Sequence, residues 1–455
     1  MHPSDPSLEP ADGPTFSPWI SRIRTWGAEI WSGARSHAVA IGLLTAYAVL
    51  RAWAEAPTDP QLFPDSGGYL NPGSAVTPRP FLLPFVYDVF TSDGSRVAAQ
   101  CVFGTIAWGT LAVVVSSQIK TSILGYLTLA TFLAFGLIPE LLVWDGALLS
   151  ESVSLSLAAL LVALLAIIVR RPTTVGLVGF GVVATAWVFT RDANAPVLLF
   201  LCLPLAVVIG SRVSWTRAGV VAGVAVALFA LSTVSVDARK SWQQPMVDVI
   251  GQRILPDRGL REYFADHGMP TTPRVLDLSG EKASSHNWAF YDIHPFMKWV
   301  HDDARQTYAR YLVTHPGYTL DGPWQDREVI LSGTPPTESS FRQVLPFHNL
   351  LYFAGLNKIA LWTLVVLLLA GVVAMRYGWD RLWAVPLVLI ASTIPQAIYV
   401  YQASALEVGR HSMTLAIMLR LGLIWLLFLA IDRILIAERN RKTKPRGAVN
   451  PRMGT

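Results

Sequence analysis

One acidic residue in a glycine-containing turn is the first candidate for chemistry in this sequence. Asp65 lies in the stretch PDSGGY, residues 64–69, just after the first hydrophobic segment. The two glycines let the backbone turn tightly, while Ser66 and Tyr69 supply hydroxyl groups close to the carboxyl. A carboxylate in such a place can accept a proton from a hydroxyl group that attacks a substrate. Asp65 is therefore our candidate general base, with Ser66 and Tyr69 as supporting residues.

An arginine follows in the same segment. Arg79 precedes an apolar, proline-punctuated stretch in TPRPFLLP, residues 77–84, and an arginine can bind a phosphate through two parallel hydrogen bonds. A plainer interpretation stays open for both residues. Asp65 would form an Asx-turn with its own backbone, and Arg79 would extend toward lipid phosphates at the membrane surface.

A second acidic group occurs between two long apolar runs. Ser150 and Glu151 resemble a helix N-cap followed by an acid in the first turn, and Asp145 lies just before them. Glu140 falls inside an apolar run, where an acid is costly and usually faces a protein interior or a wet cavity. A structural and a functional role both stay open for Glu140, Asp145 and Glu151.

Further charged residues flank other apolar runs. Arg191 follows one run, and Glu407, Arg410 and His411 precede another. Each alone would form only a weak surface ion pair, but together with Asp65 they are expected at one membrane face. The longest polar segment contributes further histidines, among them His267, His286, His294, His301 and His315. We expect the group His301-Asp302-Asp303 to form a solvated helix face, because adjacent helical side chains diverge.

Composition identifies the fold class. Of 455 residues, 52% are hydrophobic and 15% are charged, whereas a soluble domain carries about 25% charged residues. The apolar residues form runs of about 17 to 23, which is the length that crosses a bilayer. We therefore predict an all-α polytopic membrane protein in a lipid bilayer. The net charge of +5 reflects membrane topology and indicates no nucleic-acid partner.

Further observations narrow the possible covalent links, metal sites and enzyme classes. Cys101 and Cys202 both lie in predicted spans, so no disulfide links the parts outside the membrane and cysteines form no zinc cluster. The first apolar run is long enough to span, so we expect no cleavable signal peptide. The sequence contains no nucleotide-binding loop and no hydrolase elbow motif.

Hydropathy predicts about ten spans. Their expected limits are roughly 38–54, 98–117, 123–143, 148–169, 173–190, 194–211, 218–236, 356–375, 382–400 and 413–432. The distribution of Lys and Arg places both termini in the cytoplasm under the positive-inside rule. We expect a multi-pass protein of the plasma (inner) membrane, with its active site on the extracytoplasmic side.

The predicted domains follow from these spans. A cytoplasmic segment, 1–37, precedes a seven-span module, 38–236, which includes a first outer loop, 55–97. An extracytoplasmic loop domain, 237–355, is followed by three C-terminal helices, 356–432, and a basic cytoplasmic tail, 433–455. Within the loop domain, the spacing from Met297 to Val313 predicts an amphipathic helix that ends at His315-Pro316-Gly317.

This arrangement resembles the GT-C superfamily of integral-membrane glycosyltransferases, which use polyprenyl-phosphate sugars. The resemblance rests on Asp65-Ser66-x-x-Tyr69 after the first span, Arg79-Pro80, Ser150-Glu151, the large loop after the seventh span, and Gly409-Arg410-His411. It implies that Asp65 is the general base and that Arg191, Arg410 or Arg79 binds the donor phosphate. Many members carry paired acids in the first loop, whereas here a partner acid would be Asp145 or Glu151. A requirement for a divalent cation stays open.

The resemblance implies an enzyme of cell-envelope glycan biosynthesis. It would transfer a sugar from a polyprenyl-phosphate donor to an extracytoplasmic glycan, lipid or protein acceptor, with Tyr69, Asp145, Glu151 and His411 supporting the site. Two alternatives remain. One is a transporter or flippase of a lipid-linked substrate, which predicts internal symmetry and polar residues deep in the spans. The other is an enzyme similar to the O-antigen ligases, which would depend on arginines and on His294.

Overall fold

The computed structural model describes residues 34–56, 59–71, 78–333 and 341–443. Over these ranges the backbone is helical, apart from turns, loops and one isolated bridge between Gln61 and Ala147. The predicted segment 1–37 lies outside the described residues up to position 33, and the tail lies outside them from position 444.

Eight helical segments are long and apolar enough to cross a membrane. This agrees with a polytopic helical membrane protein, because such lengths match the hydrocarbon core. The segments are α2 (Ala34–Glu55), α5 (Asp93–Ser116), α8 (Glu151–Arg170), α10 (Asn194–Arg212), α11 (Trp215–Arg239), α20 (Leu356–Tyr377), Arg381–Ala403, which contains α21 (Ala384–Ala391) and α22 (Thr393–Ala403), and α24 (Met413–Thr443).

Two of the ten expected spans differ from this set. The run expected at 123–143 forms α6 (Ser122–Phe135) and α7 (Pro139–Asp145), which are bent by 50° relative to each other. Pro139 is the first residue of α7 and has no N–H to continue the helix that precedes it. The run expected at 173–190 forms α9 (Thr174–Val188), which has only 15 residues. Counting the bent pair as one span gives nine.

Two predicted limits also move. The fourth span begins at Glu151 rather than near 148, because residues 146–150 form a short connection packed under the first loop. The last helix, α24, continues to Thr443, well beyond the expected end near 432. Part of the segment predicted as a basic tail is therefore helical.

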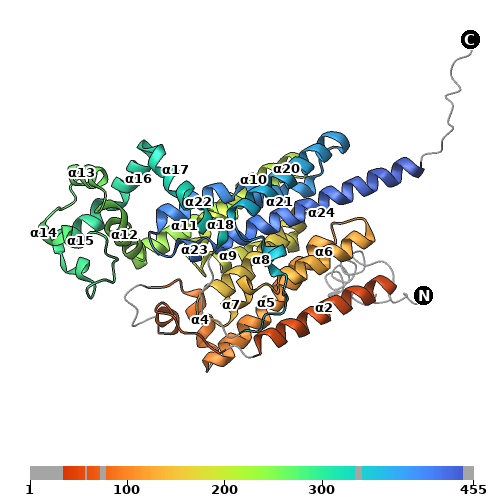
Figure 1. Ribbon diagram of the computed structural model, residues 1–455, viewed down its shortest axis with the longest axis horizontal. Coiled ribbons are helices and arrows are strands. Elements are labelled where there is room, and N and C mark those ends of the chain that lie inside the picture. The colour runs from red at the N-terminus through yellow and green to blue at the C-terminus, as the bar shows by residue number, and fades with distance from the viewer. Residues whose placement is uncertain (1–33, 57–58, 72–77, 334–340, 444–455) are drawn as a thin grey trace, which may run out of the picture.

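A group of short helices projects from one end of the bundle (Figure 1). We call residues 243–314 the cap domain. It has its own buried core, which includes Ile250, Phe264, Phe290 and Phe296. Its helices are α12 (Gln243–Val249), α13 (Arg258–Asp266), α14 (Pro273–Leu276), α15 (His294–Trp299) and α16 (Arg305–Thr314). The start of α2 and the end of α24 lie at the opposite end of the bundle (Figure 1).

The amphipathic helix predicted from Met297 to Val313 falls within α15, a π turn at Val300–Ala304, and α16. It ends at Thr314, before Pro316, as its sequence indicates. The chain then returns through α17 (Pro316–Gln325), α18 (Arg327–Ser332) and α19 (His348–Tyr352). Tyr352 and Phe353 are buried in the core of the bundle rather than in the cap domain. The range predicted as one loop domain thus contributes to two cores.

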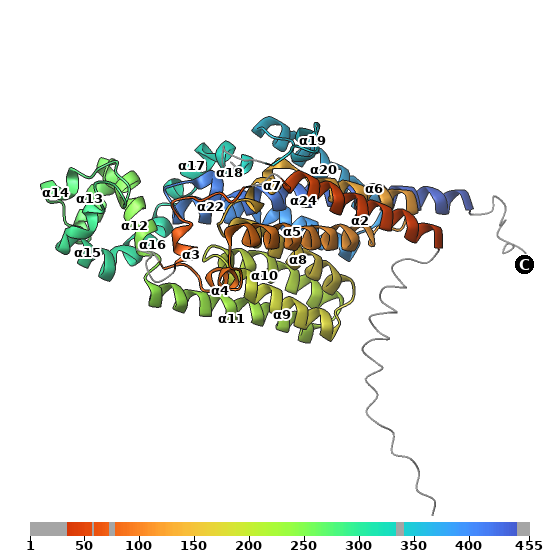
Figure 2. The same ribbon diagram turned by 90° about the horizontal axis from the view of Figure 1, so that it is seen from below.

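The first loop is fixed to the connection between α7 and α8. The Gln61 amide donates to the Gly146 carbonyl at 2.8 Å, and the Leu148 amide donates to the Gln61 carbonyl at 3.1 Å. Two short helices follow, α3 (Gly67–Leu70) and α4 (Leu82–Asp88), and they lie beside α5 and α8 at the cap-domain end of the bundle (Figure 2). These contacts place Asp65 and Arg79 close to the start of α8.

Candidate functional site

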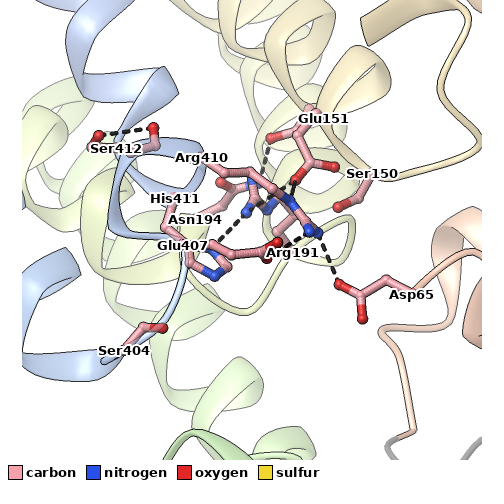
Figure 3. A network of polar contacts seen from close by, with 12 residues as sticks. Asp65, Ser150, Glu151, Arg191, Asn194, Ser404, Glu407, Arg410, His411 and Ser412 are labelled. Atoms are coloured by element: carbon pink, nitrogen blue, oxygen red, sulfur yellow. Dashed lines mark hydrogen bonds and ion pairs between the residues drawn. The ribbon is translucent and has the colours of Figure 1, made fainter. Parts of the chain in front are cut away.

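An arginine near the last span joins three acids from distant parts of the chain. Arg410 lies in α23 (Val408–His411), a single turn before α24. Its Nη2 donates to Asp65 Oδ2 at 2.9 Å, its Nε to Glu151 Oε1 at 2.7 Å, and its Nη1 to Glu407 Oε2 at 2.7 Å. Figure 3 shows the guanidinium reaching between Glu151 and Asp65. Arg410 therefore connects the first loop, α8 and the end of the chain's last loop.

Asp65 has a second arginine partner. Arg79 Nη2 donates to Asp65 Oδ1 at 2.6 Å, and its guanidinium lies 5.5 Å from the ring centre of Tyr69. The backbone before Arg79 is also fixed, because Arg239 at the end of α11 donates to the Pro78 carbonyl at 3.1 Å. Both carboxylate oxygens of Asp65 thus accept a hydrogen bond from an arginine, in place of the Asx-turn that was the plainer alternative.

Arg191 and His411 complete the group. Arg191 Nη2 lies 3.0 Å from His411 Nδ1 and 3.5 Å from Glu151 Oε1. Because a guanidinium can only donate, Nδ1 of His411 is an acceptor, and the proton of the neutral imidazole is on Nε2. Burial lowers the pKa of His411, and the nearby charges of Arg191 and Arg410 lower it too. Together they bring the pKa to about 3. His411 is therefore neutral near pH 7.

The charges of this group balance, but its exposure is uneven. The arginines are Arg79, Arg191 and Arg410, and the acids are Asp65, Glu151 and Glu407. The Glu151 side chain is 1% exposed and that of Asp65 is 31% exposed. Glu151 is the sealed part of the group, whereas Asp65, Arg79 and Glu407 form its accessible edge.

Burial works to raise the pKa of the Asp65 carboxyl, but the charges of Arg79 and Arg410 outweigh it, so the pKa lies below its usual value. Near neutral pH, Asp65 is an ionised carboxylate held by two cations. One oxygen deeper in the group is unused: Glu151 Oε2 is buried and has no hydrogen-bond partner among the described residues. A buried acceptor without a partner is costly, so this oxygen lowers the stability of the group.

Most of the residues singled out from the sequence meet here. Asp65, Arg79, Glu151, Arg191, Arg410 and His411 form one network of ion pairs and hydrogen bonds. Tyr69 borders it, since its hydroxyl donates to Ser150 Oγ at 3.1 Å. Ser150 occupies the N-cap position of α8 but makes no capping bond. Ser66 holds the turn, because its Oγ accepts from the Phe63 amide at 2.9 Å.

Asp145 belongs to a different cluster. Its carboxylate accepts from Arg51 Nη2 and from Ser152 Oγ, each at 2.5 Å, and Arg51 Nε donates to Glu55 at 2.8 Å. All three charged side chains are at most 5% exposed. Arg51 and Glu55 were not singled out from the sequence. The available signal was a charged pair at positions i and i+4 near the end of an apolar run.

The two groups of acids are a poor fit for a divalent cation. Ligand atoms of Glu55, Cys101 and Asp145 lie within 4.8 Å of one another, but the Arg51 guanidinium already binds both carboxylates. Hard cations also require more oxygen ligands than this set supplies. Between Asp65 and Glu151, the charge that a cation would bring is supplied by Arg410.

The loop histidines lie away from this network. His267 and His315 stack on Tyr263 and Tyr311, and His294 begins α15 in the cap domain. Within the described ranges, His411 is the histidine that contacts the arginine and acid group.

The chain was compared with known proteins in three ways, and it matches no family model, no curated protein and no solved structure.

Proposed function

We propose that this protein is a membrane glycosyltransferase that moves a sugar from a polyprenyl-phosphate donor to an extracytoplasmic glycan, lipid or protein acceptor. The observation that carries the proposal is the convergence of Asp65, Glu151, Arg191 and Arg410 from four distant segments at the cap-domain end of the bundle. A carboxylate at an accessible edge, backed by arginines, supplies both a base and cationic stabilisation of a departing phosphate.

The reaction would proceed by direct displacement at the anomeric carbon. The acceptor hydroxyl oxygen forms the new bond to that carbon, and the bond between the carbon and the phosphate oxygen breaks. The hydroxyl proton passes to Asp65, which becomes a neutral carboxylic acid. The polyprenyl phosphate leaves with the electron pair of the broken bond, and Arg79 and Arg410 compensate its negative charge.

The ion pairs of Asp65 give this mechanism an order of events. A carboxylate held by two arginines is a weak base, because both cations lower its pKa. A donor phosphate would compete with Asp65 for hydrogen bonds from Arg79 and Arg410. As the arginines turn to the phosphate, the pKa of Asp65 rises and the carboxylate becomes a better proton acceptor. Donor binding would therefore activate the base.

The same proposal places the protein in the plasma membrane with both termini in the cytoplasm. The start of α2 and the end of α24 lie at the end of the bundle opposite the cap domain. Helices α8, α10 and α20 run toward this opposite end of the bundle and carry Arg170, Arg212 and Arg376 in their last turns. This placement of cations agrees with the positive-inside rule. The network, at the cap-domain end, would then face the extracytoplasmic side.

Substitution of Asp65 by Asn tests the mechanism. Asn keeps the size of the side chain but cannot accept the proton, so transfer should fall by about 100-fold or more. Asp93→Asn is the matched control: Asp93 is the first residue of α5 and pairs with Arg96 outside the network, and its loss should leave transfer unchanged. Near-normal turnover by well-folded Asp65→Asn protein contradicts the proposal. Mass spectrometry of envelope glycans from a deletion strain would identify the sugar and acceptor.

A further inference from the structure

A large cavity lies where three membrane-spanning helices meet the cap domain. Its volume is about 730 Å³, which falls in the range of whole-ligand pockets. Helices α10, α11 and α22 contribute its walls, and α12, α16 and α17 contribute residues from the cap-domain side. Figure 1 shows α12 and α16 at the ends of α11 and α22. A ligand in this cavity would extend from the membrane-spanning bundle to the cap domain.

The lining changes in character along the cavity. On the spans it is mainly aliphatic and aromatic, with Phe200, Phe229 and Ile398. Near the cap domain it also includes Trp242, Tyr308 and Gln402. Aromatic ring faces such as those of Trp242 and Tyr308 suit a hydroxylated head group, and the apolar walls suit an aliphatic chain. The lining therefore fits an amphiphile that is inserted in the bilayer.

The charges in the cavity disfavour a phosphate. Its cation is Arg305, which already pairs with Asp237 and lies 5.0 Å from the ring centre of Trp242. Its acid, Asp192, would repel a phosphate. Asp192 is held by Arg239 at 2.7 Å and by the Ser241 hydroxyl at 3.0 Å. A neutral, hydroxylated head group fits these charges better than a lipid phosphate does.

Two consecutive residues, Arg191 and Asp192, connect the arginine and acid network with the cavity. Arg191 contacts Glu151 and His411 in the network, whereas the next residue, Asp192, lines the cavity. Arg239, which holds Asp192, also donates to the carbonyl of Pro78, next to Arg79. Displacement with inversion brings the attacking hydroxyl and the leaving group to opposite faces of the sugar. With the leaving phosphate at the network and the acceptor in the cavity, the two would reach the sugar from different sides.

We propose that this cavity binds the acceptor, and that the acceptor is a lipid-anchored molecule with an uncharged, hydroxyl-bearing head group. The inference rests on the proposed glycosyltransferase function and narrows its acceptor class to a lipid. The aliphatic chain lies between α10, α11 and α22. The head group lies against the cap domain and presents its hydroxyl toward Arg191 and Asp65.

Photocrosslinking of the full-length protein in membranes tests this assignment. The probe is dodecyl glucoside with a diazirine in its alkyl chain, and a diazirine-bearing prenyl phosphate is the comparison. The cavity is filled with Ser232→Trp, since Ser232 is buried and lines it. The matched control is Val234→Trp on the same helix, at a side chain that is 67% exposed.

We expect the glucoside probe to label residues of α11 and α22 in the wild type, Val234→Trp and Asp65→Asn. Labelling should fall at least about tenfold in Ser232→Trp, and unlabelled glucoside should compete with it. Labelling that Ser232→Trp leaves unchanged overturns the proposal, and so does preferential labelling by the prenyl phosphate. Retained glucoside labelling without any sugar transfer by the wild type would instead contradict the proposed function and leave lipid binding in place.

A transfer assay adds a second criterion. Ser232→Trp should lose transfer to a lipid acceptor, whereas Val234→Trp should keep it. Normal transfer by folded Ser232→Trp protein would overturn the acceptor site while supporting the glycosyltransferase function.

Discussion

Asp65 and Arg410 are 345 residues apart in the chain, and their side chains are joined by a hydrogen bond of 2.9 Å. The same guanidinium binds the buried Glu151. Because α23 is a single turn between two spans, these ion pairs hold it against the first loop and α8. The candidate base and the candidate phosphate ligands are thus parts of one electrostatic unit, and changes in one member alter the others.

The buried acid of this unit should be essential for folding. Replacement of Glu151 by Gln removes the charge that compensates Arg191 and Arg410 in a sealed environment. Breaking a buried pair from one side costs about 3–5 kcal/mol, so we expect a large drop in thermal stability in detergent. Glu407→Gln is the control, since Glu407 is 57% exposed and its pair should contribute less than about 1 kcal/mol. Equal effects of the two variants would argue against a sealed Glu151.

Substitutions at two neighbouring glycines distinguish the effect of moving Arg79 from general effects on the turn. A Cβ at Gly68 would approach Arg79 Cγ to 3.0 Å and Nε to 3.1 Å, whereas a Cβ at Gly67 meets no atom within 4 Å. Gly68→Ala should move Arg79 from Asp65 and raise the KM for the donor by about tenfold, which corresponds to about 1.4 kcal/mol. Gly67→Ala should change neither KM nor kcat. A similar KM for both variants would show that Arg79 does not bind the donor.

The neutral His411 makes stability depend on pH. Its pKa is lowered to about 3 by burial and by the adjacent arginines, whereas an unfolded histidine has a pKa of about 6.5. Between these values the unfolded chain binds a proton that the folded protein does not, so the free energy of unfolding rises with pH. The contribution is complete above about pH 6.5 and falls by up to about 1.4 kcal/mol per unit below it.

Thermal unfolding at pH 7 and pH 5 measures this effect. The wild type should lose more stability on acidification than His411→Asn, which cannot titrate. Because both proteins share the other histidines, the difference isolates His411. Identical losses would mean that the imidazole takes up its proton in the folded protein over the same pH range as in the unfolded chain.

Asp145 should act in folding rather than in transfer. Its carboxylate binds Arg51 and Ser152 inside the bundle, away from the Arg410 network. Asp145→Asn leaves Arg51 partly uncompensated and should cost about 3–5 kcal/mol, measured as a lower unfolding temperature and yield. The kcat per folded molecule should stay near the wild-type value. A large loss of kcat without loss of stability would return Asp145 to the active site.

Much of the fold follows from local properties of the chain. Apolar runs of bilayer length identify the spans, since a backbone in lipid must satisfy its hydrogen bonds within a helix. The exceptions arise from single residues and from helix length, as at Pro139, where α7 starts in a new direction, and in α9, which has only 15 residues. The helix predicted from Met297 to Val313 was also found, within His294–Thr314, because its apolar spacing and the following proline are local signals.

The sequence by itself determined the class of protein and the charged residues that lie at the ends of its spans. It could not determine which charges pair, because ion pairs depend on how helices pack and not on distance along the chain. Asp145 and Glu151 are six positions apart and looked equivalent, yet α7 directs one toward Arg51 and α8 directs the other toward Arg410. Tertiary structure alone placed Asp65 between two arginines, since the packing of the bundle brings the first loop and α23 together.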